Sequence, residues 1–384
     1  MRDVAIIGIG QTKISEHWDK SLRELAGDAA LEAMAEAQVS HVNSVYVGNM
    51  LSDISNLQAH LGSMVADWIG QRFTDAIKLE SACSSGGAAF RAGYLAVASG
   101  EVDVVLVVGV EKMTDSPGSE ITSALATAAD ADWEVDHGLS FVALNALIMK
   151  RYMYEYGWKG IDFSEFAINA HANAVHNPYA RFRKPITQDG FMKSTMICDP
   201  INLLDASPVG DGAAAVILAR TDMLPSNGTK IVVAGSSAAT DTIAIHNRKA
   251  PLRLTAAEKS TQKAYAQAGI GPEDIGVFEY HDAFTIMAAL SLEAGGFVEP
   301  GKGPVLAKEG EIKIGGRIPV ATRGGLKARG HPVGATGMYQ IVEVVQQLRG
   351  AAGETQVPRY DFGMAQNIGG SGSNIVTHIL KRVQ

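Results

Sequence analysis

The sequence predicts an α/β fold of two similar layered halves, each a five-stranded βαβαβαββ unit, with a helical and loop insertion in the first half. Apolar strand-like segments alternate with helical patterns along most of the 384 residues, which is typical of layered α/β proteins. The same succession of elements occurs twice along the chain. The 41 glycines and 46% apolar residues suit a large core connected by many tight turns.

The first half is expected to open with a strand over residues 4–8. A helix follows, because Ser21 and Glu24 form a capping-box pattern ahead of an apolar stripe at helical spacing. Cys83 is expected to lie in the turn between a strand and a helix. The other strands expected in this half cover residues 45–47, 76–79, 104–108 and 213–218.

The second half repeats this order. It is expected to open with a strand over residues 231–235, and Thr255 and Glu258 form a second capping-box pattern ahead of its first helix. A glycine-rich run from Gly330 takes the place that Cys83 has in the first half, again between a strand and a helix. The remaining strands expected here cover residues 277–280, 360–365 and 374–379.

Three segments follow from this repeat. The first half is assigned to residues 1–115 plus 200–222, the insertion to residues 116–199 and the second half to residues 229–384. The turn-rich segment Leu224–Gly228 is expected to link the halves. An insertion of this length predicts a functional lid or binding element rather than a structureless loop.

The composition of the chain indicates which classes of partner and which cellular compartment to expect. A net charge of −8 argues against nucleic acid or an anionic membrane surface as the main partner. Two cysteines are too few for a disulfide framework, so we expect a reducing compartment and a cytoplasmic protein. The ten histidines do not cluster with cysteines or carboxylates at ligand spacing, and no metal site is expected.

Candidate catalytic residues stand at the strand ends. The positive end of the helix after Cys83 favours a thiolate, so we expect the pKa of this thiol to be lowered, with a nearby histidine adding to the effect. His331 occupies the equivalent position in the second half, and a pseudo-two-fold packing of the halves would bring thiol and imidazole together. His281 directly follows a strand, where α/β proteins place site groups. The glycine turn at 367–374 is either a plain hairpin or a source of backbone donors for an oxyanion.

These four segments, in this order, resemble the thiolase superfamily over essentially the whole chain, and above all the archaeal and sterol-carrier-type thiolases. The run Gly324–Gly337 is the most specific signal, and His281-Asp282 stands where the sterol-carrier type has His-Asp. The resemblance implies a thiolase-like fold and a homodimer or tetramer. It also implies that coenzyme A thioesters are substrates, with no permanently bound cofactor.

The resemblance implies a role for each site residue. Cys83 would be the nucleophile that takes an acyl group from acyl-CoA, and His331 would accept its proton. His281 with His331 would serve one oxyanion hole, and the backbone N–H groups of Cys83 and Gly369 the other. The insertion would cradle coenzyme A, for which the expected contacts are Arg181, Arg183, Lys184 and Ser237.

One departure from the family pattern concerns the second catalytic cysteine, the acid/base that removes the α-proton. It stands at position 367 in bacterial-type thiolases and at position 283 in many sterol-carrier-type relatives, but this chain has Asn367 and Ala283. Cys198 matches neither motif and is expected to be structural. An amide cannot act as a base, so His281 is the replacement expected from the sequence.

Three functions remain open at this point. The first is an acetyl-CoA acetyltransferase or broader 3-ketoacyl-CoA thiolase. The second is a condensing enzyme like ketoacyl synthase or hydroxymethylglutaryl-CoA synthase. The third is a thiolase-like subunit with little turnover of its own, which the missing cysteine favours. Archaeal relatives associate with hydroxymethylglutaryl-CoA synthase through a small zinc-binding scaffold protein, so such a complex is also an expected partner.

Overall fold

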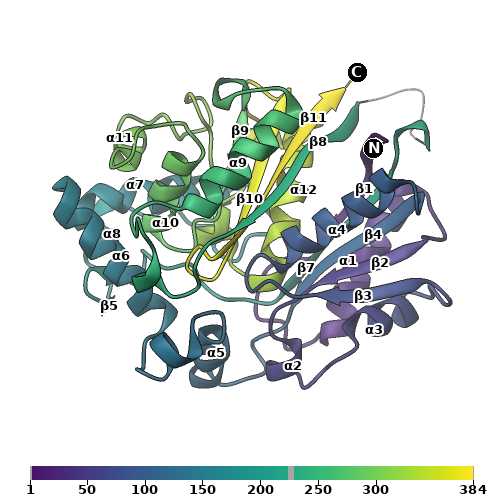
Figure 1. Ribbon diagram of the computed structural model, residues 1–384, viewed down its shortest axis with the longest axis horizontal. Coiled ribbons are helices and arrows are strands. Elements are labelled where there is room, and N and C mark those ends of the chain that lie inside the picture. The colour runs from purple at the N-terminus through teal and green to yellow at the C-terminus, as the bar shows by residue number, and fades with distance from the viewer. Residues whose placement is uncertain (1, 224–228, 384) are drawn as a thin grey trace.

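The computed structural model describes residues 2–223 and 229–383, so the expected linker Leu224–Gly228 lies outside the described residues. Figure 1 shows the predicted α/β fold of two layered halves, with the purple and blue first half beside the green and yellow second half. Within these two described ranges, no helix is long and apolar enough to cross a membrane.

Among the residues that the structure describes, nine strands form one mixed sheet in the order β3-β2-β4-β7-β1-β8-β11-β10-β9, and β5 and β6 pair separately inside the insertion. The strands are β1 (Val4–Gln11), β2 (Ser44–Gly48), β3 (Asp75–Leu79), β4 (Val104–Glu111), β5 (Met196–Cys198), β6 (Ile201–Asn202), β7 (Gly212–Arg220), β8 (Lys230–Thr240), β9 (Val277–Glu279), β10 (Phe362–Gly369) and β11 (Asn374–Val383). The halves join where β1 and β8 pair antiparallel through Ala5 with Val232 and Ile6 with Ile231.

The first half has the five sheet strands that the sequence predicts, but the second half has four. The strand expected before Gly330 is reduced to an isolated parallel bridge between Val320 and Phe278. The Thr322 N–H donates to the side chain of Glu279 (2.8 Å) instead of to a neighbouring strand. The chain then turns away at two glycines with positive φ, Gly324 and Gly325, and this ends the pairing.

Helices cover both faces of the sheet and fill the layer between the halves. They are α1 (Leu22–Ala37), α2 (Ser52–Ser55), α3 (Leu61–Trp68), α4 (Ser85–Ser99), α5 (Gly118–Ala126), α6 (Phe141–Tyr156), α7 (Ser164–Ala174), α8 (Gln188–Met192), α9 (Thr255–Ala268), α10 (Thr285–Ala294), α11 (Gly303–Lys308) and α12 (Thr336–Leu348). The inner pair, α4 and α12, contact each other and share an apolar cluster that includes Phe90, Met338 and Val342. Outer helices cover the other faces: α1 lies on the first half and α9 on the second.

The two predicted capping boxes have different outcomes. The box at α1 is confirmed, since Glu24 N donates to Ser21 Oγ and Ser21 N donates to the Glu24 carboxylate. The box at α9 is wrong, because Thr255 already lies inside the helix and the N-cap is the buried Leu254. Glu258 instead accepts a hydrogen bond from Arg253 Nε (2.8 Å).

The segment between β4 and β7 supplies α5 to α8 together with the short β5–β6 pair, shown in teal in Figure 1. It packs against the second half, because α6 and α7 both contact α10. Tyr152 on α6 donates to Glu293 Oε1 on α10 (2.5 Å), and both side chains are largely buried. This contact ties the insertion to the second half.

Candidate active site

Three strand-to-helix turns bring together the three side chains singled out in the sequence. Cys83 lies between β3 and α4, one residue before the N-cap Ser84, while His281 follows β9 and His331 precedes α12. A ring nitrogen of each histidine and the Cys83 Sγ all lie within 4.8 Å of one another. The two imidazole rings are perpendicular, with centroids 5.1 Å apart. The expected meeting of thiol and imidazole is therefore present.

These groups lie at a cavity of about 240 Å³ with a mainly apolar lining. Residues 83, 281 and 331 share its wall with Ala206, Ser207, Val209, Ala283, Phe284, Met287, Val333, Ile368 and Gly370. The insertion adds Thr122, Leu125, Ser140, Phe141, Val142 and Asn145 to the lining. Sequence reasoning missed these six residues, because a serine before an apolar helical run indicates the N-cap of α6 but not what the helix start faces.

The Cys83 thiol is not activated in the way the helix position suggested. Burial raises its pKa to about 12, and the nearby Glu111 carboxylate adds to the effect. The side chain is only 8% exposed, so the loss of hydration outweighs the favourable end of α4. The expectation of a lowered pKa was wrong, and the resting group is a neutral thiol.

The two histidines are neutral as well. Burial lowers the pKa of His331 to about 3, and the Arg329 charge acts in the same direction. Burial also lowers the pKa of His281 well below its usual value, with His331 and Arg329 contributing. The backbone N–H of His331 donates to the Pro208 carbonyl (2.9 Å), and its ring Nδ1 lies 2.7 Å from Thr336 Oγ1.

Asn367 occupies one of the two positions expected for a second catalytic cysteine, and it connects three parts of the site. Its Oδ1 accepts a hydrogen bond from the Gly87 N–H in the first turn of α4 (3.2 Å). Its Nδ2 lies 3.1 Å from His281 Nδ1. Because Oδ1 is engaged with an N–H donor, the amide orientation is fixed and Nδ2 donates to the imidazole.

The glycine turn packs directly against the nucleophile turn. A Cβ on Gly369 would come within 2.6 Å of the Ser81 carbonyl, so only glycine allows this approach. Asn374 at the far side of the turn donates to Ser84 Oγ (3.1 Å) and to Ser81. The backbone at Gly369 thus lies against the turn Ser81–Ser84 that contains Cys83.

Glu111 joins the two halves beneath the site and was not singled out in the sequence. Its buried carboxylate accepts hydrogen bonds from the N–H groups of Met50 (3.0 Å) and Leu51 (3.0 Å) and from the Asn49 amide (2.8 Å). It also accepts one from Gly334 N (2.9 Å), in the turn between His331 and α12. Burial raises the pKa of Glu111 to about 7 despite these donors.

The four expected coenzyme A contacts do not line the cavity. Arg181 pairs with Glu16 (2.6 Å), and Arg183 donates to the Val175 carbonyl. Lys184 accepts a hydrogen bond from His171 through its carbonyl. Ser237 is buried within β8, and its carbonyl accepts from Ser260 Oγ (3.1 Å).

Cys83, His281 and His331 are also spaced so that they could hold a metal ion. Sequence spacing did not suggest this, because the three residues come from distant segments. The hydrogen bonds at both Nδ1 atoms leave each Nε2 to face other groups. A thiol beside two neutral imidazoles is equally the arrangement for nucleophilic acyl transfer.

The chain matches "Thiolase, N-terminal domain" over residues 4–222 and "Thiolase C-terminal domain-like" over residues 237–382. It belongs to the thiolase family. It is 44% identical to an acetyl-CoA acetyltransferase of Methanothermobacter thermautotrophicus, with 100% of both chains covered. It is 34% identical to the benzoylsuccinyl-CoA thiolase subunit BbsB of Thauera aromatica, covering 91% of this chain and 89% of that protein. Its fold resembles the Ltp2-ChsH2(DUF35) aldolase with a TM-score of 0.86, at 24% identity, over 99% of this chain and 97% of that one.

Proposed function

We propose that the protein is an acetyl-CoA C-acyltransferase, which transfers an acyl group from acyl-CoA to Cys83. In the synthetic direction this group is condensed with a second acyl-CoA to a 3-ketoacyl-CoA such as acetoacetyl-CoA, and in the reverse direction a 3-ketoacyl-CoA is cleaved by thiolysis. The observation that carries the proposal is the close set of Cys83 Sγ and the two imidazoles at one cavity. The name of the archaeal relative at 44% identity supports the same activity.

In the proposed first step, the Cys83 sulfur attacks the thioester carbonyl while its proton passes to His331. The carbonyl oxygen is stabilised by the backbone N–H groups of Cys83 and Gly369. The tetrahedral intermediate expels the coenzyme A thiolate, which takes the proton back from His331. Because the thiol has a raised pKa of about 12, proton transfer accompanies attack and does not precede it.

The apolar wall gives this chemistry a low-water environment. Phe141, Val142 and Met287 face the reacting groups across the cavity and disfavour hydrolysis of the acyl-enzyme. We propose that pantetheine enters past the start of α6, where Ser140 and Asn145 supply polar partners for its amides. The basic residues Arg181, Arg183 and Lys184 stay a prediction for the phosphates of coenzyme A.

A second function is supported by the absence of cysteine at positions 283 and 367. In it, the chain is a subunit that is acylated but completes carbon–carbon chemistry only with a partner protein. The resemblance to archaeal thiolases that associate with hydroxymethylglutaryl-CoA synthase through a scaffold protein implies such a partner. The alternative of a condensing enzyme of the hydroxymethylglutaryl-CoA synthase type has no observation of its own in its favour.

Intact-protein mass spectrometry after mixing with acetyl-CoA tests the proposal, followed by thiolysis of acetoacetyl-CoA with the same sample. We expect a 42 Da acetyl adduct that is absent in Cys83→Ala and retained in Cys198→Ala, together with thiolysis. An adduct without thiolysis would select the partner-dependent subunit. If the wild-type protein shows no adduct and no thiolysis, the proposed acyl transfer is refuted.

A further inference from the structure

The second half-reaction of the proposed cycle needs a base that removes the α-proton of the second acyl-CoA. Among the cavity-lining residues that the structure describes, the groups able to move protons are Cys83, His281, His331 and the hydroxyls of Thr122, Ser140 and Ser207. That lining includes no carboxylate and no second thiol. Once Cys83 carries the acyl group it cannot accept a proton, and hydroxyls are far too weak as bases. The α-proton of the second acyl-CoA must therefore go to one of the two imidazoles.

His281 is arranged as a donor. The Gly87 N–H fixes the Asn367 amide so that Nδ2 donates to His281 Nδ1 (3.1 Å). An imidazole that accepts at Nδ1 carries its proton on Nε2 in the neutral form. The nitrogen of His281 that remains for the substrate is consequently an N–H, which stabilises a developing oxyanion but accepts no proton.

His331 has the opposite arrangement. Its Nδ1 lies 2.7 Å from Thr336 Oγ1, a hydroxyl oxygen that can accept from an Nδ1–H. In that tautomer Nε2 has a free lone pair near the Cys83 Sγ. Backbone bonding to Pro208 and the bridge to Val209 fix the position of the ring.

We propose that His331 is the single base for both half-reactions, and that His281 acts only as a hydrogen-bond donor to the enolate oxygen. This inference rests on the proposed acyltransferase function. It replaces the sequence-based expectation that His281 takes over the role of the absent second cysteine.

The protons balance over the cycle. In acylation His331 takes the Cys83 proton and gives it to the departing coenzyme A thiolate, so His331 is neutral when the second acetyl-CoA binds. It then removes the α-proton, and the resulting enolate attacks the acyl-enzyme carbonyl. Collapse of the intermediate breaks the C–S bond, and the Cys83 thiolate recovers its proton from His331. No further acid, base or oxidant is needed.

Exchange of the acetyl-CoA methyl protons with D₂O, followed by mass spectrometry, isolates the disputed step. In a Cys83→Ala background no acylation occurs, so exchange reports only enolate formation. We expect Cys83→Ala to exchange these protons. The exchange rate should fall about 100-fold or more in Cys83→Ala/His331→Asn. It should be largely retained in Cys83→Ala/His281→Gln, because glutamine can donate a hydrogen bond but is not a base. Cys83→Ala/His41→Asn, at an exposed histidine, is the matched control.

Two results would overturn the inference. One is exchange that persists in the His331 double variant but disappears in the His281→Gln double variant. The other is wild-type exchange that vanishes in Cys83→Ala alone, since Cys83 would then be needed for deprotonation. Failure of the proposed function is recognised separately, as the absence of both the acetyl adduct and thiolysis in the wild-type protein. Circular dichroism melting confirms that each variant is folded.

Discussion

At the scale of single residues, the environment of Cys83 decides its chemistry more than its place in the chain does. The sequence places the thiol at a helix start, where a lowered pKa is the ordinary expectation. The fold adds two features that local sequence does not contain: nearly complete burial and the Glu111 carboxylate, which arrives from the end of β4. Both favour the neutral thiol.

This environment predicts a pH-dependent effect of Glu111 on Cys83. Iodoacetamide alkylation of Cys83 needs the thiolate, so with a thiol pKa of about 12 its rate should rise about tenfold per pH unit from pH 7 to pH 10. Glu111 is charged only above its pKa of about 7, where it opposes the thiolate. Glu111→Gln should therefore be alkylated several-fold faster than wild type at pH 9, with little difference at pH 6. A rate ratio independent of pH would contradict this reading.

A buried ion pair supports the turn that carries His331. Arg329 and Glu343 are both almost fully buried and form a salt bridge between that segment and α12. Removing one partner leaves an uncompensated charge in the core, so Glu343→Gln should lower the free energy of unfolding by about 3–5 kcal/mol. Glu155→Gln, which breaks an exposed pair with Arg151, should cost under about 1 kcal/mol. Urea denaturation of both variants makes the comparison, and equal losses would refute the role of burial.

At the scale of elements, the site depends on close approach between turns from the two halves. Gly334 lies against Glu111 and Met50, and a Cβ there would come within 2.6 Å of both the Glu111 carboxylate and the Met50 nitrogen. Gly86, in the first turn of α4, lies in turn against the Gly334 carbonyl. Small residues at these positions let the starts of α4 and α12 meet, and this meeting brings Cys83 to His331.

Gly334→Ala should therefore displace the His331 turn. We expect a loss of about 1–3 kcal/mol in the free energy of unfolding and a larger fractional loss in the rate of acyl-enzyme formation. Gly315→Ala is the matched control, since a Cβ at that exposed glycine would meet no atom within 4 Å. A Gly334→Ala protein that forms the acyl-enzyme at the wild-type rate would show that the contact is not needed.

The sequence predicts the elements better than it predicts their ends and neighbours. Short apolar runs located the nine sheet strands found among the described residues, since buried strands leave a local signal. The tenth expected strand does not form, because the Thr322 N–H donates to the Glu279 side chain instead of to a neighbouring strand, and no sequence pattern reveals this bond. Likewise, the repeat predicted that Cys83 and His331 meet, whereas the burial that sets their pKa values and the wall formed by α5 and α6 arise only from packing between distant segments.

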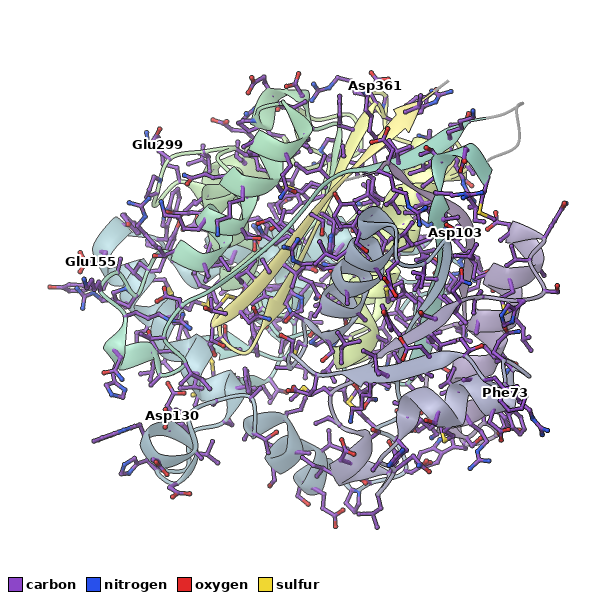
Figure 2. All side chains as sticks on the ribbon, turned by 45° about the vertical axis from the view of Figure 1, so that its right-hand side comes forward. Phe73, Asp103, Asp130, Glu155, Glu299 and Asp361 are labelled. Carbon is purple, nitrogen blue, oxygen red and sulfur yellow. The ribbon has the colours of Figure 1, made fainter. Side chains whose placement is uncertain are left out.

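At the scale of the whole molecule, the sheet ends at one side in β3, an edge strand with apolar side chains around it. Ile77 on β3 is 45% exposed and Phe73, just before it, is fully exposed. Figure 2 shows Phe73 at the periphery of the first half. An exposed apolar edge of this kind favours pairing with another strand. We propose that the protein forms the homodimer expected from the family resemblance through this edge.

Light scattering tests the dimer. The wild-type protein should have twice the chain mass of 40.5 kDa, and Ile77→Lys should shift the population toward the monomer because a charge at the edge disfavours strand pairing. Leu147→Lys, at an exposed apolar residue of the insertion, should leave the mass unchanged. A wild-type monomer, or a dimer lost only with Leu147→Lys, would place the interface elsewhere.

The shared sheet and the inner pair α4 and α12 have a consequence for how the chain is made. A ribosome releases the first half, with Cys83, well before it adds the segment from Gly330 onward. Until that segment docks, the apolar inner face of α4 lacks α12, and Cys83 lacks its second-half neighbours His281, His331 and Val333. The nucleophile is therefore made well before the histidines that it works with, and docking of the second half completes the site.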